Sequence, residues 1–207
     1  YFIVNVENKG MDIGGFYISL NIIYTRGIMY NMMTKLHTKT NVSWLEDLLY
    51  PYIYESRQNF VNFNSLSLGS YYTLLPIDNL QLRTIHYFLK KKRNIDINSS
   101  GFVKILKKKD EILQKYINKY GKPRMLKDKK FKDMLKQRFP CFYAGSIFTI
   151  KKIVIDNLID IIPLYSYNLF KYGYVIDDGI TISLPHAIER LVGYLSYFLE
   201  MINSLGS

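Results

Sequence analysis

The sequence predicts an α/β fold, and three observations lead to this class. Segments rich in β-branched and aromatic residues alternate with segments of helical periodicity, as in a sheet flanked by helices. The 207 residues, 48% of them hydrophobic, suffice for one core, and we expect a single domain over residues 1–207. Strand, helix, strand and helix follow one another closely at the start of the chain. This order favours parallel pairing, and ligands bind such sheets at the carboxyl ends of the strands.

The first fifty residues are expected to form two strand–helix units. The segment YFIVNV has the composition of a strand, and Asn8-Lys9-Gly10 follows it as a turn. Asp12 and Ser43 are placed to cap the two helices, and the second helix should stop near Pro51. The expected elements are a strand over 1–6, a helix over 14–25, a strand over 28–36 and a helix from 43 to 51.

The rest of the chain continues the mixed pattern. The last helix is the clearest, because Ser183 can cap it, Pro185 sits in its first turn and an apolar stripe follows. The stripe consists of Ile188, Leu191, Val192, Leu195, Phe198 and Leu199. The other expected elements are a strand over 66–75, helices over 77–92 and 102–120, a strand over 142–150 interrupted at Gly145-Ser146, and a helix over 152–161.

The positive charge of the chain is concentrated in one segment. Residues 90–138 hold 18 Lys/Arg against 5 Asp/Glu, a net charge of +13, whereas the whole chain carries +11. We expect this segment to be a basic helical insertion with a solvated face. The alternative is a non-catalytic binding module that uses this segment on nucleic acid or an acidic surface. The near-neutral remainder disfavours nucleic acid as the partner.

Simple counts exclude several classes of protein. The single cysteine, Cys141, rules out an internal disulfide and a cysteine-built metal site, and we expect it in the core. No apolar run reaches the length of a transmembrane helix, since Ile147–Ile162 is interrupted by charged residues. No secretory leader is visible, and we expect a cytoplasmic protein; the alternative is that a leader preceded Tyr1 and was removed.

Two polar clusters follow the expected N-terminal strands. Gly10, Gly14 and Gly15 surround a strand-to-helix turn that could bring backbone N–H groups to an anion, or could simply be a tight turn capped by Asp12. Further on, Lys35, His37 and Lys39 alternate and so share one face of a strand end. A diphosphate would satisfy such a face, although a solvated strand end would also accommodate it.

A third cluster lies near the C-terminus. Asp177-Asp178-Gly179 precedes a helix on which His186, Glu189 and Arg190 lie at i, i+3 and i+4. Adjacent carboxylates can hold a hard cation or supply a general base. A turn followed by a surface ion pair is the alternative.

Taken in order, these clusters resemble the rhamnan synthesis protein F family of glycosyltransferases. Four segments carry the resemblance. They are NKGMDIGGF (residues 8–16), KLHTK with Trp44 and Leu48-Leu49 behind it (35–49), FYAGSIF (142–148), and DGIT followed by HAIERL (178–191). The chain departs from the family where Gly15 and Tyr143 replace proline and Thr149 replaces tryptophan. The family also carries a strand–helix–strand unit ahead of the first segment.

The resemblance implies a GT-A-like mixed sheet flanked by helices, and an inverting sugar transfer from a nucleotide-diphosphate sugar to a glycan or lipid-linked glycan. It implies Asp178 as the general base, with Glu189 in reserve. The implied donor-binding residues are Asn8, Lys9, Asp12, His37, Thr38, Lys39, Gly145, Ser146, His186 and Arg190. Mn²⁺ or Mg²⁺ is a possible cofactor, with His37 or Asp178 as its ligand. His37 and Lys39 could instead contact the diphosphate directly, because the family's His-Thr-Lys segment falls where many GT-A enzymes carry Asp-x-Asp.

Overall fold

The fold comes from a computed structural model, which describes most of the N-terminal third and the C-terminal half of the chain. The described residues are 3–7, 9–37, 41–53, 66–70, 73–77, 111, 114, 115, 117–119, 128–170 and 184–205. Asn8, Thr38, Lys39 and Asp178 therefore lie outside the described residues. The expected helix over 77–92, apart from its first residue, and most of that over 102–120 lie outside them as well.

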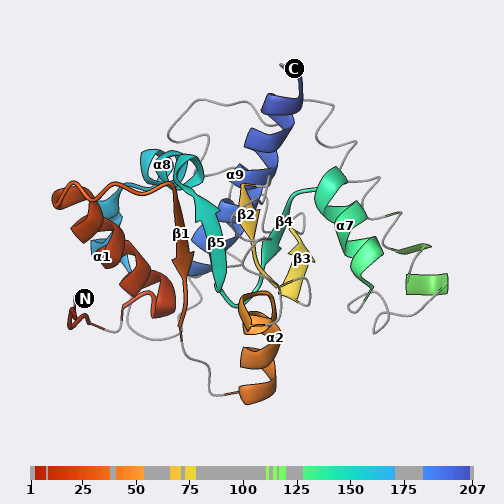
Figure 1. The fold of residues 1–207 in the computed structure, drawn as a ribbon, viewed down its shortest axis with the longest axis horizontal. Coiled ribbons are helices and arrows are strands. Elements are labelled where there is room, and N and C mark those ends of the chain that lie inside the picture. The colour runs from red at the N-terminus through yellow and green to blue at the C-terminus, as the bar shows by residue number, and fades with distance from the viewer. Residues whose placement is uncertain are drawn as a thin grey trace.

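Helices and short strands mix along the chain, which confirms an α/β composition (Figure 1). In chain order the elements are α1 (Met11–Thr25), β1 (Met32–Lys35), α2 (Val42–Ile53), β2 (Ser67–Leu68), β3 (Leu74–Pro76), α7 (Lys129–Arg138), β4 (Cys141–Tyr143), β5 (Phe148–Lys151), α8 (Lys152–Ile161), η2 (Leu164–Leu169) and α9 (Leu184–Leu205).

All described strand pairs are antiparallel, so the expectation of parallel pairing is wrong for this part of the chain. One sheet has the order β1-β5-β2, and a second consists of β3 and β4. In the first sheet Met32 pairs with Lys151 and Lys35 with Phe148. The strand after α1 therefore pairs with a strand more than a hundred residues later, and not with a neighbour in sequence.

The centre of the three-stranded sheet is a buried polar residue. Thr149 of β5 is 0% exposed. Its hydroxyl lies 2.7 Å from that of Thr34 on β1 and 3.3 Å from the hydroxyl of Tyr52 on α2. These contacts satisfy the buried hydroxyl and also fix the register between β1 and β5.

Helices cover the sheets and close the core. The apolar stripe of α9 is buried at Ile188, Leu191, Val192 and Leu195, as its periodicity predicted. This helix packs against β4, α8 and α1, while α1 also packs against η2. In Figure 1, α1 and α8 lie on one side of the sheets and α7 on the other, with α9 passing behind them.

Several element predictions are confirmed and others are wrong. Helix α8 has the predicted bounds, and the predicted strand over 142–150 is broken at Gly145-Ser146 as expected. Residues 3–7, in contrast, form no strand, and Ile3 is 94% exposed, because strand composition alone supplies no pairing partner. The segment 66–75 yields two very short strands and not one.

The caps predicted at Asp12 and Ser43 are also wrong, whereas Ser183, the cap predicted for α9, lies outside the described residues. Helix α1 begins one residue before Asp12, after Gly10 in the left-handed conformation (φ 66°), and no side chain caps it. The Asp12 carboxylate faces Lys35 instead. Asn41 and not Ser43 caps α2, because its Oδ1 accepts the Trp44 N–H at 3.0 Å. That helix continues through Pro51 to Ile53.

Candidate functional site

Residues from all four resembling segments meet in one polar network. Asp12 lies in the first turn of α1, and Lys35 ends β1 with His37 just beyond it. Gly145 and Ser146 form the turn between β4 and β5, and Glu189 lies on α9. Asp12 and Glu189, from the first and last of these segments, are 177 positions apart in the sequence. The fold thus assembles in space what the sequence presents as separate clusters.

Lys35 lies at the centre of this network and contacts residues of three different segments. Its side chain is only 5% exposed. Its Nζ lies 2.5 Å from Asp12 Oδ2, 2.8 Å from the Ser146 carbonyl oxygen and 3.1 Å from His37 Nδ1. The three acceptors match the three N–H donors of an ammonium group. Lys35 therefore ties α1, the end of β1 and the 144–146 turn together, and its charge is already compensated by Asp12.

The turn at Gly145-Ser146 has an unusual backbone. Gly145 has φ 91° and Ser146 has φ 57°, which is uncommon for a residue with a side chain. A Cβ at Gly145 would approach Leu48 to 2.8 Å and Trp44 to 3.1 Å, so helix α2 packs directly over the turn. Such a turn persists only where surrounding contacts hold it in place.

Glu189 on α9 supplies two of those contacts. Its Oε1 accepts the Gly145 N–H at 2.8 Å and the Ser146 hydroxyl at 2.8 Å. Its Oε2 accepts a hydrogen bond from Arg190. The carboxylate is buried, and burial raises the pKa of Glu189 despite the opposing effects of Arg190 and Ser146. Oε1 therefore holds the turn, while Oε2 is bound by Arg190 on the same helix.

Arg190 and His186 complete the α9 side of the network. The Arg190 guanidinium lies over the ring of Phe142 at 4.4 Å and donates to the His186 carbonyl at 3.2 Å. Burial lowers the pKa of His186, and the neighbouring Arg190 lowers it further, while Asp12 acts in the opposite direction. His186 is accordingly neutral near pH 7.

The network is balanced in charge. Lys35 faces Asp12, and Arg190 faces Glu189. The sequence left Lys35 on a strand end that either is solvated or faces a diphosphate, but the structure places this lysine among internal acceptors. Lys9, another expected donor-binding residue, forms an ion pair with Glu7 at 2.7 Å. Lys39, on the same segment as Lys35, lies outside the described residues.

The side chains of the network can be tested as ligands for Mn²⁺ or Mg²⁺, the cofactors that the resemblance allows. Such ions require several oxygen ligands, and in the described part of the chain no group of three or more His, Cys, Asp or Glu residues is arranged to hold a metal. Asp12 is already bound to Lys35, and His37 Nδ1 faces the same ammonium group. These residues do not fit a metal centre in this arrangement. Asp178, the other candidate ligand, is outside the described residues.

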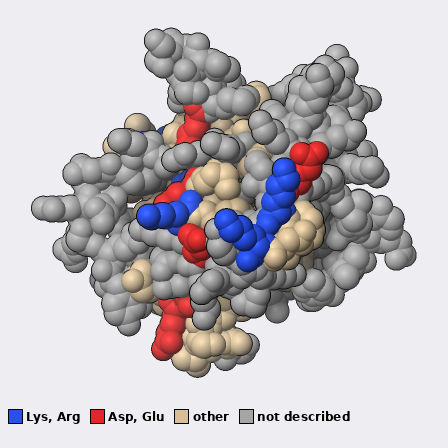
Figure 2. Space-filling view, turned by 90° about the vertical axis from the view of Figure 1, so that its right-hand side faces the viewer, with Lys and Arg blue, Asp and Glu red and all other residues tan. Residues whose placement is uncertain are grey.

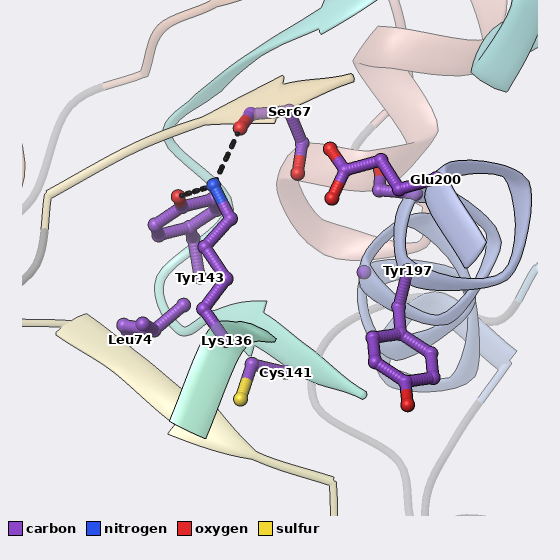
Figure 3. Close-up of a pocket in the computed structure, with 9 residues that line it drawn as sticks. Ser67, Leu74, Lys136, Cys141, Tyr143, Tyr197 and Glu200 are labelled. Carbon is purple, nitrogen blue, oxygen red and sulfur yellow. Dashed lines mark hydrogen bonds between the residues drawn. The ribbon is translucent and has the colours of Figure 1, made fainter. Parts of the chain in front are cut away.

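A second polar cluster lies beneath α7, and sequence reasoning missed it. Lys136 Nζ donates to the Ser67 carbonyl oxygen and to the Tyr143 hydroxyl, both at 3.0 Å (Figure 3). Glu200 of α9 lies across the same small pocket, where its Oε1 accepts the Leu66 N–H at 2.6 Å. Burial alone would lower the pKa of Lys136, but Tyr143 and Glu200 raise it above its ordinary value. A lysine in a basic helix gives no sequence signal for such an inward position.

The described surface on the α7 side is mixed in charge. Figure 2 shows Lys and Arg side chains interspersed with Asp and Glu on this face. On α7 itself both Lys130 and Asp133 are exposed. Both signs of charge are therefore present on the part of the basic segment that the structure describes.

Comparisons with known proteins give no match. No family model, curated protein or solved structure matches this chain. Within the described residues, no helix has the length and apolar character needed to cross a membrane.

Proposed function

We propose that this chain is a glycosyltransferase that moves a sugar from a nucleotide-diphosphate sugar to a glycan acceptor, as its resemblance to the rhamnan synthesis protein F family implies. A GT-A-like arrangement of the whole chain is part of the same proposal. The observation that carries it is the meeting of residues from four separate resembling segments in one hydrogen-bonded network. Convergence of residues far apart in sequence is typical of a functional site.

Each group in the network has a role in this proposal. The turn at Gly145-Ser146 offers small residues and backbone atoms against which a donor sugar can lie closely. His37 and Lys39 contact the diphosphate, whose negative charge grows as the sugar leaves. Asp178 removes the proton from the acceptor hydroxyl. Glu189 braces the turn, because its buried oxygens already accept hydrogen bonds from Gly145, Ser146 and Arg190.

Ligand-induced stabilisation tests the donor-binding step. A ligand that binds only the folded state raises the free energy of unfolding, by about 2.7 kcal/mol at a ligand concentration 100 times Kd. The melting temperature rises with it. We expect one of a panel of UDP-, dTDP- and GDP-sugars to produce this shift in the wild-type chain. Lys39→Ala should abolish or strongly reduce the shift.

Lys130→Ala is the matched control, because it removes the same charge from an exposed position on α7. It should leave the shift intact. Equal losses in both variants would indicate general electrostatic attraction by a basic chain. The absence of a shift with every sugar nucleotide in the panel would contradict the proposal, and tight binding of nucleic acid with a steep salt dependence would favour the binding-module alternative.

A further inference from the structure

The contact between Lys35 and His37 constrains the proton on the imidazole ring. Lys35 Nζ lies 3.1 Å from His37 Nδ1, within hydrogen-bonding distance. An ammonium nitrogen has only donors, so Nδ1 must be the acceptor in this contact. Asp12 Oδ2 is 3.5 Å from the same Nδ1 and already accepts from Lys35 at 2.5 Å. The shorter contact favours a lone pair, and not a proton, on Nδ1.

The surroundings hold Lys35 in the orientation that this contact needs. The ammonium group is fixed on two other sides by the Asp12 carboxylate and the Ser146 carbonyl oxygen. Two of its N–H groups donate to these acceptors, and the third contact of the ammonium group is with His37. A neutral imidazole that accepts at Nδ1 carries its proton on Nε2.

We propose that Lys35 is a positioning residue that holds His37 as the neutral tautomer protonated on Nε2, so that His37 offers a ligand a hydrogen-bond donor and no metal-coordinating lone pair. A diphosphate oxygen is the acceptor that this donor fits, a step that rests on the proposed function. Of the two roles that the sequence left open for His37, direct contact with the diphosphate and metal coordination, the geometry disfavours coordination through Nδ1, because this nitrogen faces the Lys35 ammonium group.

Nitrogen NMR of the histidine rings tests the tautomer without any assay of activity. The chain has three histidines, so ¹⁵N-histidine labelling with His37→Gln and His186→Gln as assignment variants identifies the His37 signals. At neutral pH we expect an unprotonated Nδ1 and a protonated Nε2 for His37. A proton on Nδ1, or a doubly protonated ring, in the wild-type chain would overturn the proposal.

Two Lys35 variants separate positioning from general structural support. Lys35→Met removes the donor, and the His37 signals should move toward a mixture of tautomers, while His186 keeps its wild-type spectrum. Lys35→Arg retains a donor and should restore the Nε2-protonated form. Unchanged His37 signals in a folded Lys35→Met variant would show that Lys35 does not set the tautomer. If that variant does not fold, the wild-type spectrum alone decides the state of the ring.

Two additions to the wild-type sample test what His37 binds. Substoichiometric Mn²⁺ should cause no selective broadening of the His37 ring signals, and selective broadening would overturn the proposal. UDP should shift the Nε2–H signal of His37, and UDP binding without this shift would contradict the donor role. Failure of UDP and every sugar nucleotide to bind would instead contradict the proposed function, and the tautomer would still be decided by the spectra without ligand.

Discussion

At the residue scale, the network works by matching charged groups to partners inside the protein. Glu189 is 6% exposed and Lys35 is 6% exposed, so each would cost several kcal/mol if it lacked a partner. Each is instead bound on more than one side. Because both side chains contact the 144–146 turn, their interactions keep that turn in one conformation.

Glu189→Ala should destabilise the protein strongly. The change removes the acceptor for Gly145 N–H and the Ser146 hydroxyl and leaves the Arg190 guanidinium without its carboxylate. Removing one partner of a buried ion pair costs about 3–5 kcal/mol. Urea denaturation of the two chains measures this loss. Glu189→Gln keeps one acceptor oxygen and should lose less, and equal stability of the alanine variant and wild type would contradict the bracing role.

His186 should make the protein less stable in mild acid. Burial and Arg190 lower its pKa below 6.5, so the unfolded chain binds the proton more tightly than the folded one. Its contribution is therefore complete above pH 6.5 and is lost as the pH falls from 6.5 through the pKa of the folded state. A tenfold difference in proton affinity between the two states corresponds to about 1.4 kcal/mol of stability.

The matched variant is His186→Gln, which does not titrate in this range. The difference in unfolding free energy between wild type and this variant, measured on both sides of pH 6.5, isolates the contribution of His186. Glu189 acts in the opposite direction, since a raised pKa adds stability as the pH falls through it. A difference that does not depend on pH would contradict the depressed pKa of His186.

At the scale of elements, α9 approaches β4 closely at a glycine. A Cβ at Gly193 would lie 2.0 Å from the Cys141 carbonyl oxygen and 2.7 Å from Phe142 Cα. These are backbone atoms, so neither can rotate away. The glycine is therefore what lets this helix lie directly on the strand that leads into the 144–146 turn.

Gly193→Ala and Gly15→Ala should change stability in opposite directions. Both residues are helical, but a Cβ at Gly15 meets no atom within 4 Å. Alanine at position 15 should therefore stabilise by about 1 kcal/mol through helix propensity. Alanine at position 193 should destabilise by about 1–3 kcal/mol or more through overpacking. Thermal unfolding of the two variants measures both effects, and stabilisation by both would contradict the close packing of α9 on β4.

Helix α7 should depend on Lys136 for its attachment to the core. Lys136→Met removes hydrogen bonds to the Ser67 carbonyl oxygen and the Tyr143 hydroxyl, with an expected loss of about 1–3 kcal/mol. Hydrogen exchange should accelerate in α7 in this variant. Lys130→Met, at an exposed position of the same helix, should leave exchange unchanged. Similar exchange rates in all three proteins would show that Lys136 does not anchor the helix.

Sequence patterns predicted some elements well because local chemistry determines them. The apolar stripe of α9 and the break at Gly145-Ser146 are local signals, and both are present in the structure. The strand predicted over 1–6 is not formed by its described residues 3–6, because a strand needs a pairing partner, which composition does not reveal. The roles of Lys35 and Lys136 could not be found from sequence, because each side chain turns inward to acceptors from distant segments.

At the scale of the whole molecule, the three-stranded sheet joins an N-terminal and a C-terminal part of the chain. Strand β1 pairs with β5, and α1 packs against η2 and α9. The polar network follows the same plan, since Asp12 and Lys35 from the first part of the chain meet Ser146 and Glu189 from the last. The polar network and the hydrophobic core therefore depend on the same long-range contacts. A substitution that weakens packing in the core is expected to alter the geometry of the network as well.

This arrangement has a consequence for synthesis on the ribosome. Strand β5, which pairs with β1 in the structure, lies more than a hundred residues after it in the sequence. It therefore leaves the exit tunnel only after these residues have been translated. At about 5–20 residues per second, the apolar face of α1 waits at least several seconds for β5, η2 and α9. During that interval Ile13, Phe16 and Leu20, all buried in the finished protein, are open to chaperones or to aggregation. Slow codons placed between β1 and β5 would lengthen this exposure, because they delay the strand that pairs with β1.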